Sequence, residues 1–258
     1  MLLSESDKDW LRINYPELTA LSGTSRAYQG LFAFDMLYDK VGQQYIINPN
    51  GGGVSDRMRI RDKYTILVNF NGSSDAFPTV KEIGGRIQKV ATDRKLQLAD
   101  VHINLGGDAC LCFELERPTH LPNGFNLPEF FRRLVIPFFF AESFFEKYNY
   151  WPWGQRSHGV LGLFEWYLDN NDHRGMDAIE SAVGFLKRNQ YKTDYGKQLR
   201  GEAQIKGHQH CPCGSSFIFR KCHERSFRGL WKLHDDIKIL SKANKTNQQR
   251  LKEILNGF

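Results

Sequence analysis

Three cysteines and a histidine within thirteen residues constrain the C-terminal third of this chain more than any other feature. Cys211 and Cys213 flank a proline, and after eight further residues Cys222 and His223 stand side by side. Three thiolates and one imidazole make a complete tetrahedral ligand set for zinc. Because four protein ligands leave no open coordination position, we expect a structural site that is closed to substrate.

The residues between these ligands extend the pattern. The run Cys-Pro-Cys-Gly-Ser, followed by an aromatic and basic spacer and then Cys-His, closely resembles the SEC-C motif. The resemblance implies a small zinc-binding module at about residues 208–226. His208 and His210 precede the first cysteine, and we interpret them either as spare ligands or as solvated loop histidines.

Charge is distributed unevenly along the chain. Residues 174–258 hold 17 lysines and arginines against 8 acidic residues, whereas residues 1–173 hold 18 against 21. A basic tail indicates an acidic protein partner or nucleic acid. A solvated helical surface is the alternative, because the tail has no basic run interleaved with aromatic residues. We place a domain boundary in the polar segment 169–172, which gives domains at 1–172 and 173–258.

The hydrophobic pattern of the first domain predicts an α+β fold. Aromatic and β-branched segments indicate strands, and apolar residues at helical spacing indicate helices. The predicted strands are 25–37, 44–47 and 64–70. The predicted helices of the whole chain are 4–22, 127–148, 160–168, 176–188 and 232–255. The phenylalanines of 127–148 should pack in a core, and Pro137 should kink or break that helix.

A second cysteine-containing segment indicates chemistry. Cys110 follows a Gly-Gly-Asp turn, and His102 and Asn104 precede it by eight and six residues. A thiolate is a nucleophile, and a nearby amide donor can stabilise a tetrahedral oxyanion. The alternative is that free cysteines are small buried hydrophobic residues and that the glycines only make a turn.

The same segment resembles the active-site segment of ubiquitin-conjugating enzymes. In that family a His-Pro-Asn triplet precedes a loop, a glycine and a catalytic Cys-Leu pair; here residues 102–104 are His-Ile-Asn and residues 110–111 are Cys-Leu. The resemblance implies the family's antiparallel sheet with flanking helices and a thioester on Cys110 rather than Cys112. It also implies that Asn104 orients the backbone or stabilises the oxyanion, and that His102 shapes the loop.

Other segments are similar to one bacterial branch of that family, which is encoded beside cyclic-nucleotide synthases in CBASS antiphage operons. They are Pro78–Ile87, Ser157-His158-Gly159 and Glu165-Trp166-Tyr167, and the resemblance covers roughly residues 20–170. It implies that Cys110 accepts the C-terminal carboxyl of the nucleotide synthase and passes it to a lysine or another nucleophile in antiphage defence. No adenylating domain or nucleotide-binding loop is recognisable, so we expect either a separate activating enzyme or a system that works without one.

Two other functions stay open. The chain could be a non-catalytic, zinc-containing adaptor that binds a partner protein or nucleic acid, or a Cys-His hydrolase that uses Cys110 with His102 or His158. The longest apolar stretch, residues 134–141, is far shorter than the ~18 residues of a membrane span, and the N-terminus turns acidic at once. We therefore expect a cytoplasmic protein without membrane contact, and five cysteines fit a reducing compartment.

Overall fold

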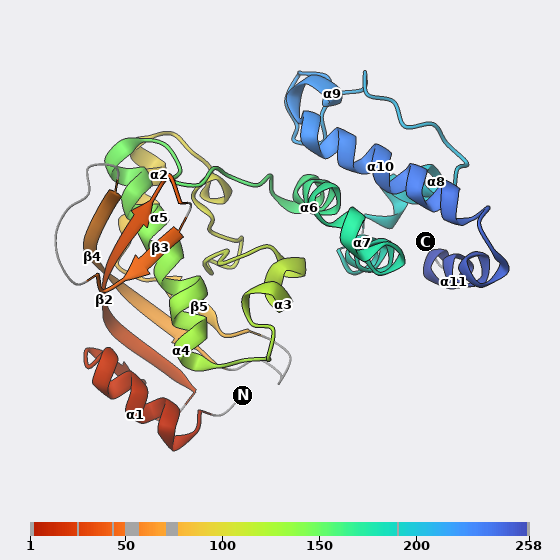
Figure 1. Cartoon of the computed structure of the whole chain (residues 1–258). Helices are drawn as coiled ribbons and strands as arrows, with labels where there is room; N and C mark the ends of the chain where they lie inside the picture. The colour runs from red at the N-terminus through yellow and green to blue at the C-terminus, as the bar shows by residue number, and fades with distance from the viewer. Residues whose placement is uncertain are drawn as a thin grey trace. The chain divides into compact units, whose positions relative to one another are not determined.

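The computed structural model describes residues 3–24, 26–42, 44–49, 57–70, 77–189 and 191–256 (Figure 1). The chain divides into two compact units, Met1–Gln155 and Arg156–Phe258, and each is described by itself below. The polar segment in which we placed the domain boundary lies inside helix α6 (Gly159–Arg174). The chain stays helical there because its polar side chains bond within the helix; Asn170 Nδ2, for example, donates to the Trp166 carbonyl at 2.8 Å.

The N-terminal unit contains a five-stranded antiparallel sheet, which with its flanking helices confirms the predicted α+β class. The strands are β1 (Leu18–Ala20), β2 (Ala27–Asp39), β3 (Gln44–Ile47), β4 (Arg57–Asn69) and β5 (Thr79–Glu82). Their order is β1-β2-β4-β5, and β3 pairs with the last residues of β2. The two long strands, β2 and β4, pair along their whole length, from Ala27 opposite Asn69 to Asp39 opposite Arg57.

The limits of β3 match the prediction, whereas β4 begins seven residues earlier than predicted. Its first half is rich in charged residues and lacks the apolar pattern on which the predicted strand rested. In the structure Arg59 and Arg61 lie near the same carboxylate across the strand pair, with Arg59 Nη2 at 2.6 Å and Arg61 Nη2 at 2.8 Å from Asp35 Oδ2. Opposite charges on adjacent strands stabilise a sheet, which explains how a polar sequence extends it. The first residue of the predicted strand 25–37, residue 25, lies outside the described residues.

The N-terminal helix α1 (Glu5–Asn14) is shorter than the predicted 4–22. Ser4 and Asp7 form a reciprocal capping box at its start. The helix ends at Tyr15 because Pro16 lacks an N–H and disfavours helical geometry in the residue before it. The chain then turns directly into β1.

A long helical segment lies against the sheet, and its phenylalanines form the core as predicted. It comprises α4 (Leu127–Phe130), a π-helical turn η3 (Phe131–Val135) and α5 (Ile136–Tyr148). The ring of Phe139 lies 4.7 Å from Tyr64 and 5.4 Å from Phe32, centroid to centroid. Pro137 does not break the helix; it is the second residue of α5 and follows the π-helical turn. Proline lacks the backbone N–H of a regular helix, and a π-helical turn is a usual place for such an interruption of the hydrogen-bond pattern.

Between β5 and α4 the chain forms short elements that carry the candidate active site. They are α2 (Arg86–Asp93), the 3-10 turns η1 (Leu98–Val101) and η2 (Glu114–Glu116), and α3 (Arg117–His120). Residues 102–113, between η1 and η2, hold both cysteines of this unit.

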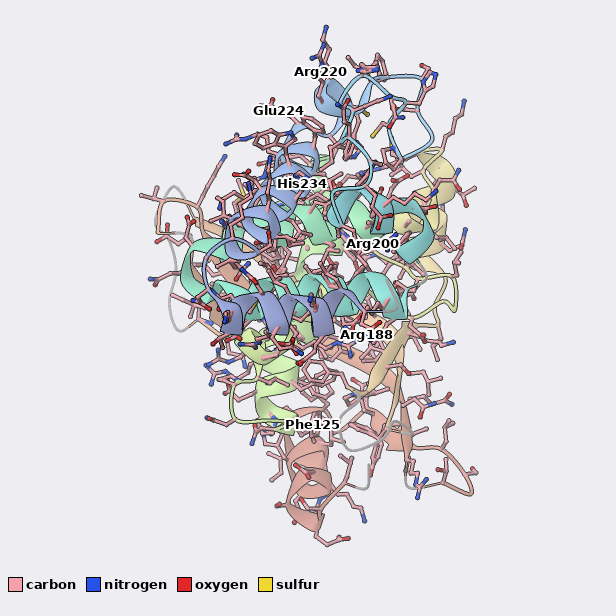
Figure 2. The ribbon with its side chains drawn as sticks, turned by 90° about the vertical axis from the view of Figure 1, so that its right-hand side faces the viewer. Phe125, Arg188, Arg200, Arg220, Glu224 and His234 are labelled. Carbon is pink, nitrogen blue, oxygen red and sulfur yellow. The ribbon has the colours of Figure 1, made fainter. Side chains whose placement is uncertain are left out.

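The C-terminal unit is helical. It consists of α6, α7 (Met176–Arg188), α8 (Lys192–Leu199), α9 (Phe219–Cys222), α10 (Glu224–Leu240) and α11 (Lys245–Leu255). Helix α10 packs along α6, and a Cβ at Gly229 would lie 1.8 Å from the carbonyl oxygen of Phe164, so only glycine permits this approach. Arg200 and His234, labelled in Figure 2, line a groove of about 600 Å³ beside α10.

The predicted helix 176–188 is confirmed residue for residue, whereas the predicted helix 232–255 is wrong. Two helices stand there, separated by residues 241–244, because the Asn244 side chain accepts the backbone N–H of Asn247 and starts a new helix. The predicted helix 160–168 extends to Arg174. Within the described part of the chain, we find no helix that is both long and apolar enough to span a bilayer.

Candidate active site and candidate metal centre

Residues 102–110 form a tight loop that places His102 opposite Cys110. Ile103 and Ala109 pair as an antiparallel bridge, and both side chains are buried in the core. The backbone N–H of Cys110 donates to the carbonyl of His102 at 2.7 Å, and His102 adopts a left-handed conformation with φ 52°. The buried bridge fixes the loop to the core, so the backbone determines the positions of His102 and Cys110.

Strand β5 anchors the other side of this loop. The N–H of Ala109 donates to the carbonyl of Val80 at 2.7 Å, and Lys81 Nζ donates to the carbonyl of Gly106 at 2.7 Å. Lys81 Nζ also lies 3.4 Å from Asp108 Oδ1. The Gly-Gly-Asp turn is therefore tied to the sheet immediately before the cysteine.

Cys110 lies in the wall of a pocket of about 600 Å³. The lining residues come from five separate segments of the N-terminal unit: Tyr38, Lys40, Tyr45, His102, Cys110, Leu111, His120, Arg133, Pro137, Phe138, Ala141, Pro152 and Trp153. Among the described residues of this lining, Cys110 is the one nucleophilic thiol; Cys112 does not contribute. In an extended segment Cys110 and Cys112 would lie on the same face, so spacing alone does not separate them. Their different positions relative to the pocket do.

The electrostatic surroundings of the two thiols also differ. Burial raises the pKa of Cys110, and the positive charge of Arg117 partly offsets this rise. Burial raises the pKa of Cys112 to about 12, so its thiolate is negligible at neutral pH. Both thiols are partly buried. Neither resembles the strongly acidified cysteine of a thiol protease, and reaction at Cys110 requires a donor that is itself activated.

His102 lies in an apolar environment beneath the pocket. The edge of its ring meets Trp151 at a centroid distance of 4.3 Å, and Nδ1 lies 3.5 Å from Oε1 of Glu142. Burial lowers the pKa of His102 to about 4 and raises the pKa of Glu142 well above its usual range. A histidine with so low a pKa is a weak base at neutral pH, which disfavours the use of His102 as the base of a Cys-His hydrolase.

Asn104 lies in the turn beyond His102 and is exposed. Its backbone N–H donates to the carbonyl of Asp108 at 2.9 Å, and its carbonyl accepts from Gly107 at 2.8 Å. The pocket lining in the described residues does not include Asn104, so the structure brings His102 and Cys110 together but not all three predicted residues. His158 belongs to the C-terminal unit, where it precedes α6.

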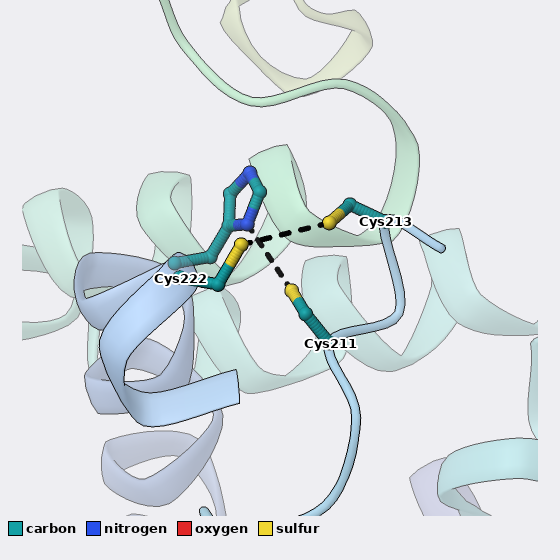
Figure 3. A group of neighbouring side chains, drawn as sticks. Cys211, Cys213 and Cys222 are labelled. Carbon is teal, nitrogen blue, oxygen red and sulfur yellow. Dashed lines mark hydrogen bonds between the residues drawn. The ribbon is translucent and has the colours of Figure 1, made fainter. Parts of the chain in front are cut away.

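The four predicted metal ligands converge in the C-terminal unit and could bind a metal ion. Figure 3 shows the three labelled cysteines with their sulfurs close together. Cys213 Sγ lies 3.7 Å from Cys222 Sγ, Cys211 Sγ lies 3.1 Å from His223 Nδ1, and all four ligand atoms lie within 4.8 Å of one another. A tetrahedral zinc site with Zn–S bonds of about 2.3 Å places sulfurs about 3.8 Å apart. The cluster therefore has the size of a closed tetrahedral site.

A short hairpin followed by a helix start positions these ligands. The N–H of Cys211 donates to the carbonyl of Phe217 at 2.9 Å, and Gly214, with φ 84°, turns the chain between them. Cys222 ends α9, and His223 precedes α10. The sequence spacing encodes this arrangement because all four ligands lie in one local supersecondary unit.

Sequence reasoning missed Ser215, whose Oγ lies 3.2 Å from the sulfurs of both Cys213 and Cys222. Its position two residues after a ligand cysteine is the signal that could have identified it. Among the described residues, the cluster consists of the four predicted ligands; His208 and His210 are exposed and do not belong to it.

Comparisons of the chain with protein-family models, with curated proteins and with solved structures found no match.

Proposed function

We propose that this protein is a cysteine-dependent protein-conjugating enzyme that carries an acyl group as a thioester on Cys110. One observation carries the proposal: the thiol of Cys110 forms part of the wall of a pocket of about 600 Å³, on a loop fixed by the core and by β5. A pocket of this size can hold the chain end that delivers the acyl carbon. The fixed loop supplies the orientation that lowers the barrier to attack.

The chemistry consists of two acyl transfers. The thiolate of Cys110 attacks the carbonyl carbon of an activated donor, such as a thioester or an acyl adenylate, and the leaving group departs with the bonding electrons. A neutral lysine amine or another nucleophile then attacks the new thioester, loses its proton to solvent, and releases the Cys110 thiolate. Asn104 acts at the tetrahedral stages as an oxyanion donor or as the residue that orients the loop backbone.

The resemblance of roughly residues 20–170 to the CBASS branch of ubiquitin-conjugating enzymes supplies the partner class. On that basis the donor is the C-terminus of a cyclic-nucleotide synthase, activated by a separate enzyme or within the same system. The α+β fold with an antiparallel sheet, followed by the loop that joins His102 to Cys110, is compatible with that family. That this chain is a member of the ubiquitin-conjugating enzyme family is part of the proposal.

Zinc is the metal that the Cys-Cys-Cys-His cluster fits, and its role in this proposal is structural. Three thiolates and one imidazole are the ligands of closed tetrahedral zinc sites, and the inter-ligand distances match that size. Such a site corresponds to the SEC-C module that the sequence resembles. It stabilises the segment between α8 and α10 and takes no part in acyl transfer.

A non-catalytic adaptor is the second candidate function. Burial raises the pKa of the Cys110 thiol, which favours the unreactive protonated form. Trp231 is 53% exposed and lines the groove beside α10 with Arg200 and His234 (Figure 2). An exposed tryptophan in a groove is typical of a surface that binds a partner.

The test is intact-protein mass spectrometry of the chain purified at mildly acidic pH after co-expression with its genomic neighbours. The conjugating enzyme predicts a mass adduct on the native protein that disappears on treatment with excess thiol. The adaptor predicts an unmodified chain that co-purifies with a partner. A hydrolase predicts release of product from a small ester or peptide substrate with no protein adduct, and that result would contradict the proposed function.

A further inference from the structure

One wall of the pocket beside Cys110 is aromatic. Trp153 stacks on Phe140 with a centroid distance of 5.8 Å and an interplanar angle of 14°, and it makes a T-shaped contact with Tyr38 at 5.4 Å. Pro137 and Phe138 complete this surface from α5. Trp153 is 45% exposed, so the wall offers an apolar contact to a bound chain.

The rim of the same pocket is cationic. Lys40 follows β2 and Arg133 lies on η3, so two positive charges from distant parts of the sequence line one cavity. His120 also lines it, and burial lowers the pKa of His120, which leaves Lys40 and Arg133 as the cations at neutral pH. No aspartate or glutamate of the described residues lines the pocket; Glu129, which pairs with Arg133, lies outside the lining.

We propose that this pocket selects acyl donors that carry an acidic side chain on the residue before the C-terminal one, with an apolar contact to Trp153. The inference rests on the proposed thioester function and names the donor class of that same site. The residues that precede the reacting carbonyl must pass through the pocket, because they are covalently joined to the carbon that Cys110 attacks. A cavity with two cations and no lining carboxylate among its described residues favours an anionic side chain there and repels a lysine.

The effect should be moderate, because both cations reach solvent. Lys40 is exposed, and the side chain of Arg133 is 48% exposed and already contacts Glu129. An exposed ion pair changes an equilibrium or a rate by up to about fivefold. With two cations, donors that carry glutamate and lysine should differ by about five- to twentyfold. High salt should reduce this difference, since it screens exposed charges.

The experiment uses the full chain and three synthetic peptide ethyl thioesters that end in Ala-Xaa-Gly, with Xaa as glutamate, glutamine or lysine. The Cys110 thiolate attacks the thioester carbonyl, the peptide passes to the Cys110 sulfur, and ethanethiol leaves as its thiolate and is protonated by water. The rate of the mass increase on the chain is measured for each peptide. The expected order is glutamate, then glutamine, then lysine.

One double variant and a control matched in charge test whether the rim causes this order. Lys40→Gln combined with Arg133→Gln, which removes both cations, should abolish the preference. Arg132→Glu is the control, because Arg132 binds the same Glu129, is 64% exposed and does not line the pocket. It should keep the preference, which separates a local effect from a change of net charge.

The two levels of the proposal fail in different ways. If all three peptides acylate Cys110 at equal rates, the donor selectivity is wrong and the thioester function stands. A preference that persists in the double variant, or disappears in Arg132→Glu, also overturns the assignment to the rim. If no peptide acylates Cys110 while free thiol is detected, both the thioester function and this inference are wrong.

Discussion

His102 and Glu142 face each other inside the N-terminal unit, and burial disfavours the charged form of both. Nδ1 of the histidine lies 3.5 Å from Oε1 of the carboxyl, and that oxygen has no hydrogen-bond partner among the described residues. Burial lowers the pKa of His102 to about 4 and raises the pKa of Glu142. The contact is therefore not an ion pair at pH 7, and the two residues make opposite contributions to the pH dependence of stability.

Glu142→Gln should remove a loss of stability that begins as pH rises above about 4.5. A carboxyl whose pKa is raised on folding keeps a proton that the unfolded chain releases, so its contribution falls as pH rises from about 4.5 through the folded pKa. Glutamine has nearly the same shape as the protonated glutamate side chain but does not titrate. Urea unfolding from pH 5 to 9 should show the variant gaining stability relative to the wild type as pH rises. A constant difference across that range would show that Glu142 is ionised in the folded protein.

His102→Gln should remove a loss of stability on the acid side. The unfolded histidine takes up a proton near pH 6.5 and the folded one only near pH 4, so folding is disfavoured as pH falls between these values. The slope is about 1.4 kcal/mol per pH unit, which gives about 3 kcal/mol over the window. The advantage of the wild type over the variant should shrink by about that amount between pH 7 and pH 4. NMR titration of the His102 ring above pH 6 would contradict this expectation.

Cys110→Ala should abolish the protein adduct, and Cys112→Ala should retain it. Cys110 lines the pocket, whereas Cys112 does not line it within the described chain and has a pKa raised to about 12. Cys110→Ser should accumulate a slower oxyester that resists excess thiol. The measurement is intact mass before and after thiol treatment. An adduct that survives Cys110→Ala and is lost in Cys112→Ala would reverse the assignment.

Asn104→Ala should slow acyl transfer by roughly 10²–10³-fold if Asn104 is an oxyanion donor. Its stability should change little, because Asn104 is exposed and holds the turn through its backbone N–H and carbonyl, which alanine keeps. Single-turnover discharge of the Cys110 thioester to a lysine amine gives the rate, and the thermal midpoint gives the stability. A variant that melts early with an unchanged rate would identify Asn104 as a structural turn residue.

The sequence revealed those features that are encoded locally. The limits of β3 and α7 and the convergence of the four candidate metal ligands each depend on residue spacing within a single segment. The start of β4 was missed because the strand depends on a cross-strand partner, Asp35, which pairs with Arg59 and Arg61. Local propensity does not record a partner more than twenty residues away.

The pocket could not be predicted for the same reason. Cys110 and His102 share one loop, so their proximity follows from the sequence, but Lys40 and Arg133 reach the cavity only through the packing of the sheet and η3. Glu142 lies within a run of phenylalanines on α5, where the sequence pattern indicates only a buried helix face. The contact between its carboxyl and His102 forms only in the folded protein, so the sequence pattern does not indicate it.

The metal centre should hold one zinc ion per chain, and its removal should unfold one defined segment. Between Gly201 and Ile218 the only buried residue is Cys211, so this segment has no apolar core of its own. Metal binding in small zinc modules supplies roughly 10–16 kcal/mol at pH 7, and the ligands must be deprotonated, so the metal should also be lost at low pH. Elemental analysis should give a metal-to-chain ratio of one for the wild type and for Cys112→Ser, and near zero for Cys222→Ser.

Loss of this metal should leave the thioester intact. The hydrophobic core of the N-terminal unit is built from residues 3 to 151 and includes no residue of the metal centre, so a chain that ends at Gln155 should fold and still form the adduct on Cys110. Chelation should raise hydrogen exchange in residues 201–223 alone. It should also slow transfer to the protein target, because we expect the C-terminal unit to be the element that docks this target. If the shortened chain is folded but forms no thioester, the metal-binding unit contributes directly to the reaction at Cys110, and the separation of the two sites is wrong.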